Sequence, residues 1–131
     1  MKKKICIVMS VYNGAITSKL CNAAKNELKR YNLNKIDLVK VPGAFEIPVA
    51  ISKMIKRYDG FIAIGCIIKG ETANFDLISF AITNSLMNIS VNNKKPIGNS
   101  ILTLFNKKQA NKRFNRGKEA AQAVYKILKI N

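Results

Sequence analysis

This sequence of 131 residues contains no histidine and no tryptophan, and it has only 7 acidic residues. Without histidine, no side chain titrates near neutral pH unless its surroundings shift its pKa, so imidazole acid–base catalysis is excluded. The three cysteines, Cys6, Cys21 and Cys66, are odd in number, widely spaced and outside any CxxC motif. A zinc site would need all three thiolates plus a carboxylate, so we expect buried free thiols and no metal site.

Long apolar runs are also missing. No run approaches the ~18 residues that a membrane-spanning helix needs, and the apolar part of the opening MKKKICIVMS is too short for a signal peptide. We therefore expect no membrane contact and a cytoplasmic location. The sequence has no internal repeat, no low-complexity tract and no Pro/Ser-rich linker, and its length fits one domain over residues 1–131.

Basic residues are abundant, because 23 Lys and Arg against 7 Asp and Glu give a formal net charge of +16. Such a charge is typical of nucleic-acid-binding proteins, which neutralise phosphates. Here the lysines are scattered, and they accompany abundant Ile and Asn, as a biased genomic base composition would produce. An anionic small substrate is an equally good use of positive potential. We therefore expect no nucleic-acid partner. A nucleic-acid-binding module is kept as an alternative, which only the net charge supports.

Hydrophobic periodicity predicts that strands and helices alternate along the chain. Strands are predicted at residues 5–10, 36–41, 61–68 and 96–104, and helices at 16–31, 45–58, 73–92, 107–113 and 117–130. Asn13-Gly14 indicates a turn, Thr17 or Ser18 is a candidate N-cap, and Pro48 fits only a first helical turn. The alternation predicts an α/β fold with three layers, αβα, in which helices cover both faces of a four-stranded parallel sheet.

In such a fold, ligands gather at the carboxyl ends of the strands. Polar segments follow all four predicted strands, at residues 10–14, 41–46, 69–74 and 103–106. Taken alone, each has an ordinary interpretation: Glu46 favours a helix start, the segment Gly70–Asn74 caps a helix, Tyr12 packs, and Arg113 is a solvated arginine. The segment Gly70–Asn74 also offers N–H groups to an anion. What favours a functional site is the predicted convergence of these segments on one edge of the sheet.

Four segments together resemble the 6,7-dimethyl-8-ribityllumazine synthase family. They are VPGAFEIP at 41–48, GCIIKGETANFD at 65–76, Tyr12-Asn13 followed by ITSKL at 16–20, and GKEAA at 117–121. The resemblance implies the family's flavodoxin-like fold. It also implies condensation of 5-amino-6-ribitylaminouracil with 3,4-dihydroxy-2-butanone 4-phosphate, with loss of phosphate and water. The family uses no metal and no organic cofactor, and it forms pentamers with active sites between neighbouring subunits.

The resemblance implies a role for each matching position. The positions that contact the pyrimidine, by stacking or by backbone groups, are Tyr12, Asn13, Cys66, Ile67 and Ile68. The positions that hold the ribityl chain are Ala44, Phe45 and Glu46. The positions that bind the phosphate are Glu71, Thr72 and Arg113. In the phosphate-binding turn we expect the Glu71 side chain to point away while N–H groups face the phosphate, and the Arg113 guanidinium suits a phosphate dianion.

The sequence departs from the family pattern at its catalytic position. Asn74 stands where the family has a histidine proton donor, and an asparagine side chain cannot titrate. Because general acid–base help is worth ~10²–10⁴-fold, we predict a slower enzyme, with Asp76 as a carboxylate two residues further on. The alternative is a weak or inactive homologue that still binds lumazine-type or flavin-type ligands.

Two further departures concern the contact between subunits. Asn99 stands where a neighbouring subunit usually lends an aromatic side chain, so we expect weaker stacking on the pyrimidine. The connection at residues 113–117 is shorter than the usual glycine-rich one, although Asn115 and Arg116 still match. The segment at 73–92 is apolar on more than one face, which suits the central contact of a homopentamer. We expect a pentamer rather than a closed shell, because the extra N-terminal strand of shell-forming relatives has no counterpart and strongly basic chains repel one another.

Overall fold

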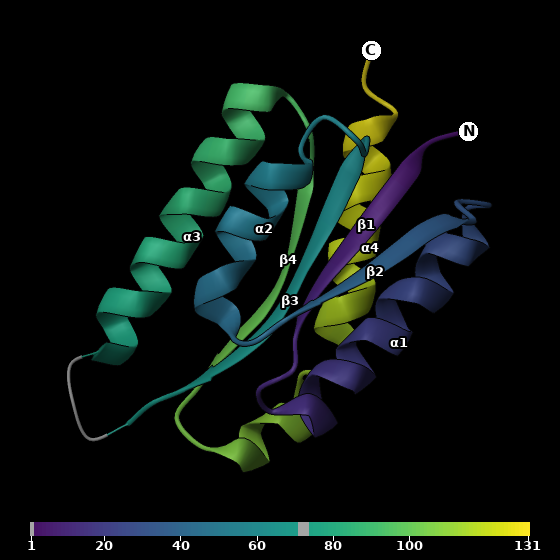
Figure 1. Ribbon diagram of the computed structural model, residues 1–131. Coiled ribbons are helices and arrows are strands. Elements are labelled where there is room, and N and C mark those ends of the chain that lie inside the picture. Colours follow the sequence, from purple (N-terminus) through teal and green to yellow (C-terminus); the bar gives the residue numbers. More distant parts are fainter. Residues whose placement is uncertain (1, 71–73) are drawn as a thin grey trace.

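The computed structural model describes residues 2–70 and 74–131. Within these residues strands and helices alternate as predicted (Figure 1). The strands are β1 Lys4–Ser10, β2 Lys35–Val41, β3 Gly60–Ile68 and β4 Ile97–Leu104. The α-helices are α1 Gly14–Arg30, α2 Ile47–Met54, α3 Asn74–Asn93 and α4 Asn115–Leu128, and the 3₁₀ helices are η1 Ala44–Glu46 and η2 Lys107–Lys112. Each strand begins and ends within one residue of its predicted position.

The strands form one parallel sheet with the order β2-β1-β3-β4. Helices α1 and α4 cover one face of the sheet, and α2 and α3 cover the other (Figure 1). The predicted fold class is therefore confirmed as a three-layer αβα arrangement of the flavodoxin-like type. Because the strands are parallel, their carboxyl ends lie at one edge of the sheet, at the lower end of the view in Figure 1. We call this edge the carboxyl rim.

Alternation along β1 explains the two hydrophobic cores. Ile5, Ile7 and Met9 pack in the core under α1 and α4, whereas Cys6 and Val8 pack in the core under α2 and α3. The neighbouring strand β3 is buried on both faces from Gly60 to Cys66, which explains its almost uninterrupted apolar sequence. The two cores fix the strands, and the strands fix where the rim loops begin.

Helices α1 and α4 are tied together by a buried carboxylate. Glu27 accepts hydrogen bonds from the Tyr31 hydroxyl at 2.7 Å, from Gln122 Nε2 at 3.0 Å and from Arg30 Nη1 at 2.8 Å. The bond from Tyr31 does most to lower the pKa of Glu27 to about 2, and those from Gln122 and Arg30 add to it against the opposing effect of burial. The carboxylate is therefore ionised at neutral pH and links α1 to α4.

Two local predictions were wrong. The helix predicted at 45–58 is η1 followed by α2, which ends at Met54. Beyond it, Lys95 Nζ donates to Ile55 O at 2.6 Å and the Tyr58 hydroxyl donates to Asp37 Oδ2 at 2.6 Å, so contacts with distant segments replace the last helical turn. The N-cap of α1 is Asn13 rather than Thr17 or Ser18, because the buried Thr17 hydroxyl donates to Ser10 O at 2.9 Å.

The three cysteines are free and buried, as predicted. Burial raises the pKa of each thiol, that of Cys6 to about 11, so the thiols are protonated near neutral pH. In the part of the chain that the structure describes, no group of three or more His, Cys, Asp or Glu side chains is placed to hold a metal ion. In the same residues, no helix has the length and apolar character needed to cross a membrane.

Candidate active site

The loops that follow β1 and β2 are hydrogen-bonded to each other at the carboxyl rim. The Val11 N–H donates to Val41 O at 2.8 Å, and the Tyr12 N–H donates to Pro42 O at 3.1 Å. These bonds extend the β1–β2 pairing beyond its last pair, Ser10 with Val41. Tyr12 consequently lies beside the VPGAFE loop, and its side chain is 71% exposed.

Asn13 joins these two loops to β3. Its Nδ2 donates to Cys66 O at 3.4 Å. The pairing of β1 with β3 ends at Met9 and Ile64, but β3 continues to Ile68, so its last residues extend beyond β1. Burial raises the pKa of the Cys66 thiol, with the charge of Lys107 acting in the opposite direction. Cys66 is therefore a thiol rather than a thiolate near neutral pH.

The VPGAFE loop is held in shape by its own glutamate. Glu46 Oε1 accepts a hydrogen bond from the Gly43 N–H at 2.9 Å. The absence of a side chain at Gly65 in β3 lets this loop approach the sheet, because a Cβ there would lie 3.3 Å from Ala44 Cβ. The Glu46 carboxylate keeps acceptor capacity for a ligand beyond this one bond.

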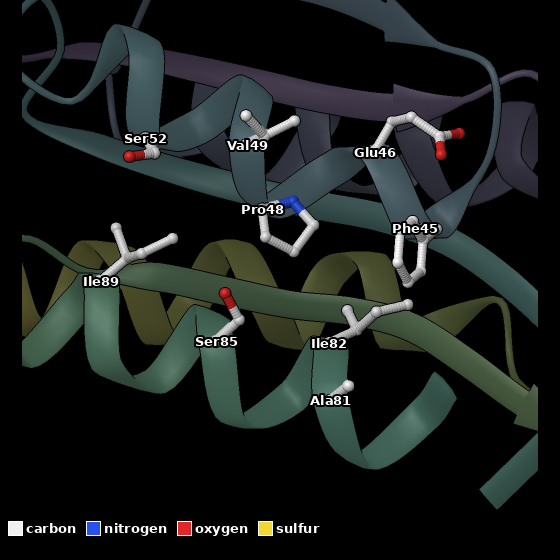
Figure 2. A pocket seen from close by; sticks show the side chains of 9 residues that line it. All are labelled: Phe45, Glu46, Pro48, Val49, Ser52, Ala81, Ile82, Ser85 and Ile89. Atoms are coloured by element: carbon white, nitrogen blue, oxygen red, sulfur yellow. The ribbon is translucent and has the colours of Figure 1, made fainter. Parts of the chain in front are cut away.

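A groove separates α2 from α3 next to this loop (Figure 2). Its volume is about 650 Å³, and it is lined by Phe45, Glu46, Pro48, Val49, Ser52, Ala81, Ile82, Ser85 and Ile89. In Figure 2 the Phe45 ring points toward Ile82, whereas the Glu46 carboxylate points away from α3. The loop therefore presents its aromatic ring to the groove and its carboxylate elsewhere.

Asn74 is the first residue of α3 and is exposed at the carboxyl rim. Asp76 lies in the first turn of the same helix, where a carboxylate is favoured by the helix dipole. Glu71 and Thr72, which were predicted to bind phosphate, lie outside the described residues. The residues at the carboxyl rim form what we call the rim group: Tyr12, Asn13, Ala44, Phe45, Glu46, Cys66, Ile67, Ile68 and Asn74.

Asn99 lies in β4, the edge strand next to β3, and Arg113 lines a cavity together with Leu102 of the same strand. Asn99 is paired with Ala63 in the middle of the β4 strand, and Arg113 ends η2. Arg116 Nε donates to Asn99 O at 3.0 Å, and Arg113 and Arg116 line one cavity of about 410 Å³. We call Asn99, Arg113 and Arg116 the edge group. The strand order puts β3 between this edge and β1.

The sequence model of the 6,7-dimethyl-8-ribityllumazine synthase family matches residues 2–131. The chain belongs to this family. It is 41% identical to the 6,7-dimethyl-8-ribityllumazine synthase of Buchnera aphidicola subsp. Baizongia pistaciae over an alignment of 140 positions, gaps included, that covers 98% of this chain and 87% of that protein. It is 35% identical to the enzyme of that name from Limosilactobacillus reuteri over an alignment of 135 positions that covers 98% of this chain and 89% of that protein.

Arg116 was not predicted as a site residue. Its match to the lumazine synthase family just before the last helix could have indicated it. Its hydrogen bond to Asn99 and the cavity it shares with Arg113 place it in the edge group. Its side chain also satisfies a backbone carbonyl that an edge strand otherwise leaves open.

The chemistry that the rim group offers is mainly binding and orientation. It has the aromatic ring of Tyr12, amides at Asn13 and Asn74, and strand backbone near Cys66. Because the sequence lacks histidine, this chain has no imidazole for the lumazine synthase reaction. The arrangement therefore suits a reaction in which aligning two reactive molecules supplies much of the rate enhancement.

Proposed function

We propose that this chain catalyses the condensation of 5-amino-6-ribitylaminouracil with 3,4-dihydroxy-2-butanone 4-phosphate to 6,7-dimethyl-8-ribityllumazine, with release of phosphate and water. The family match over residues 2–131 supports this activity, as do relatives that carry the enzyme's name over almost the whole chain. The observation that carries the proposal in the structure is the hydrogen bond from Asn13 Nδ2 to Cys66 O at 3.4 Å. It links the first rim loop, already bonded to the VPGAFE loop, to the end of β3.

The rim group then binds the ribitylated pyrimidine. The ring of Tyr12 stacks on the heterocycle, and backbone groups from Cys66 to Ile68 hydrogen-bond its edge. The carboxylate of Glu46 accepts from ribityl hydroxyls, which Phe45 and Ala44 flank. Arg113, Glu71 and Thr72 bind the phosphate of the second substrate. Alignment of two reactants in this way is worth ~7–11 kcal/mol of the barrier at the extreme.

Asn74 occupies the position from which a proton donor would act. Its amide orients a water molecule or a substrate carbonyl but neither gains nor loses a proton near neutral pH. We therefore expect turnover without the ~10²–10⁴-fold contribution of general acid–base catalysis. The chain is a slower lumazine synthase in this proposal, not an inactive one.

A homopentamer with active sites between subunits completes the proposal, together with a single domain over residues 1–131 and a cytoplasmic location. Its support is the position of Asn99 in the edge strand β4, which β3 separates from β1, because Asn99 and Tyr12 are both matched to one substrate site. A second support is α3, which buries Ile82 and Leu86 but exposes a row of large apolar side chains: Leu77, Phe80, Met87 and Val91. Exposed apolar surface of this extent marks an interface.

The test is the rate of lumazine formation from the two substrates, compared with the uncatalysed condensation under the same conditions. We expect a clear excess over the uncatalysed rate, and a much lower affinity for the pyrimidine in Tyr12→Leu than in the matched variant Tyr12→Phe, which keeps the ring. A rate equal to the uncatalysed one, with tight binding of lumazine or flavin, would refute the enzymatic activity. It would support the alternative, a homologue that binds these ligands without turnover. Light scattering should give a mass near five times the 14.6 kDa of one chain, and a mass near one chain would refute the pentamer.

A further inference from the structure

Three side chains from different elements meet at the β4 side of the carboxyl rim. Lys69 follows β3, Phe75 lies in the first turn of α3, and Phe105 follows β4. The rings of Phe75 and Phe105 have centroids 6.3 Å apart, and Lys69 Nζ lies 5.2 Å from the centroid of the Phe105 ring. Lys69 and Phe105 lie in two of the polar segments predicted to converge at the rim, but none of the three residues was given a role, and the proposed function does not use them.

The backbone holds Phe105 and Lys69 in place. The Lys69 N–H donates to Leu104 O at 2.8 Å, which joins the chain after β3 to the end of β4. The Phe105 N–H donates to Gln109 Oε1 at 2.7 Å, and the Gln109 N–H donates to Asn106 Oδ1 at 3.2 Å. Phe105 is therefore fixed at the start of the turn into η2 even though its side chain is 65% exposed.

Lys69 is a cation without a carboxylate partner in residues 2–70 and 74–131, where the recorded ion pair joins Arg30 to Glu27. An aromatic face attracts an ammonium group but does not neutralise its charge. The ammonium of Lys69 is thus held beside an aromatic face at the rim, and among the described residues no carboxylate pairs with it. Lys69 also directly follows β3, the strand that contributes Cys66, Ile67 and Ile68 to the rim group.

We infer that Lys69 binds the phosphate group of the butanone phosphate and that Phe105 is a positioning residue for Lys69. This inference rests on the proposed function. A phosphate monoester carries a charge of about −1.5 to −2 near neutral pH, so it attracts cations from more than one side. Arg113 belongs to the edge group, which a neighbouring subunit contributes in the proposed pentamer. Lys69 supplies positive charge from the other side, from the subunit whose rim group binds the pyrimidine.

The experiment compares Lys69→Gln with Lys35→Gln in the full chain. Lys35 begins β2 at the opposite end of the sheet, so its variant removes the same charge far from the rim. We expect Lys69→Gln to raise the KM for butanone phosphate, and the inhibition constant of inorganic phosphate, about tenfold, while the KM for the pyrimidine stays unchanged. Lys35→Gln should leave all three constants unchanged, and Lys69→Arg should restore phosphate affinity.

Phe105→Leu and Phe105→Tyr test the positioning role. We expect Phe105→Leu to weaken phosphate inhibition by a smaller factor than Lys69→Gln does, and Phe105→Tyr to keep it, because tyrosine retains the aromatic face. Equal phosphate affinity in Lys69→Gln and Lys35→Gln would overturn the role of Lys69. Equal affinity in Phe105→Leu and the unchanged chain would overturn the role of Phe105. Isothermal titration with inorganic phosphate needs no turnover, so these outcomes can be distinguished from a failure of the proposed activity.

Discussion

A methyl group added at Gly117 should destabilise the packing of α4 on α1. Gly117 lies in the first turn of α4, and a Cβ there would be 2.2 Å from Leu20 O and 3.0 Å from Leu20 C, whereas real Cβ atoms essentially never come within 3.0 Å of another heavy atom. Both partners in this clash are backbone, so no side-chain rotation relieves it. The two helices must separate along an interface that buries Leu20, Ala24, Ala121 and Val124.

The magnitude follows from two opposing terms. Overpacking of a well-packed interior costs about 1–3 kcal/mol, and the higher helix propensity of alanine over glycine returns at most about 1 kcal/mol. Because both clashing atoms are backbone, we take the upper end of the packing cost and subtract the gain in helix propensity. We therefore expect Gly117→Ala to lower the free energy of unfolding by ~2 kcal/mol. For a chain of this length, that corresponds to a fall in Tm of roughly 8 °C.

The assay is thermal and urea unfolding of Gly117→Ala beside Gly14→Ala at equal protein concentration, because assembly makes Tm depend on concentration. Gly14 begins α1 and has no heavy atom within 4 Å of its would-be Cβ, so its variant reports helix propensity without a clash. We expect Gly14→Ala to be neutral or slightly stabilising. If Gly117→Ala is as stable as Gly14→Ala, the close approach of α1 and α4 inferred here is wrong.

Three further predictions concern catalysis, stability and assembly. Asn74→His should raise kcat by at least tenfold, toward the ~10²–10⁴-fold range of general acid–base catalysis. The ratio of the variant's kcat to that of the unchanged chain should vary with pH near ~6.5, where the new imidazole titrates. If kcat is the same in both proteins at every pH, this position has no catalytic role. Because the folded pKa of Glu27 is about 2 against an ordinary 4.5, its carboxylate stabilises the fold above pH 4.5 and this contribution is lost as pH falls toward 2. The stability difference between the unchanged chain and Glu27→Gln, measured by urea unfolding, should therefore shrink over that range, and a constant difference would contradict the assignment. Phe80→Glu, at a side chain 74% exposed on α3, should reduce the mass measured by light scattering, whereas Lys126→Glu on α4 should not; a full-size assembly of Phe80→Glu would exclude this face as the interface.

Much of the fold could be predicted because the apolar runs in this sequence are bounded by glycine and polar residues that indicate turns. The strand β3 is apolar almost throughout and is bounded by Gly60 and Lys69, so both its length and its burial could be predicted. The end of α2 could not, because it depends on Lys95 and Asp37, which approach residues 55–58 only in the folded chain. Gly117 was predicted to start a helix, whereas α4 begins at Asn115. The need for a glycine at 117 comes from the proximity of Leu20, which no local pattern contains.

The candidate site divides in the same way. The convergence of three rim loops could be predicted from the parallel sheet alone, since the carboxyl ends of parallel strands share an edge. The link from Asn13 to Cys66 and the link from Arg116 to Asn99 could not, because each joins residues that sequence distance separates. The resemblance to the family named Asn99 and Arg113 without saying that Arg116 lies beside both of them.

The position of Asn99 in the edge strand relates activity to assembly. Tyr12 and Cys66 are joined by Asn13 at the rim, and Arg113 and Asn99 are joined by Arg116 at the β4 edge, with β3 between that edge and β1. In the proposed pentamer, one substrate site takes its rim group from one chain and its edge group from the next. We expect the apolar face of α3 in that assembly to do more than stabilise it, because this face would set the distance between the two groups. Because this chain has no imidazole to move the reaction's protons, we expect its catalysis to depend strongly on that distance.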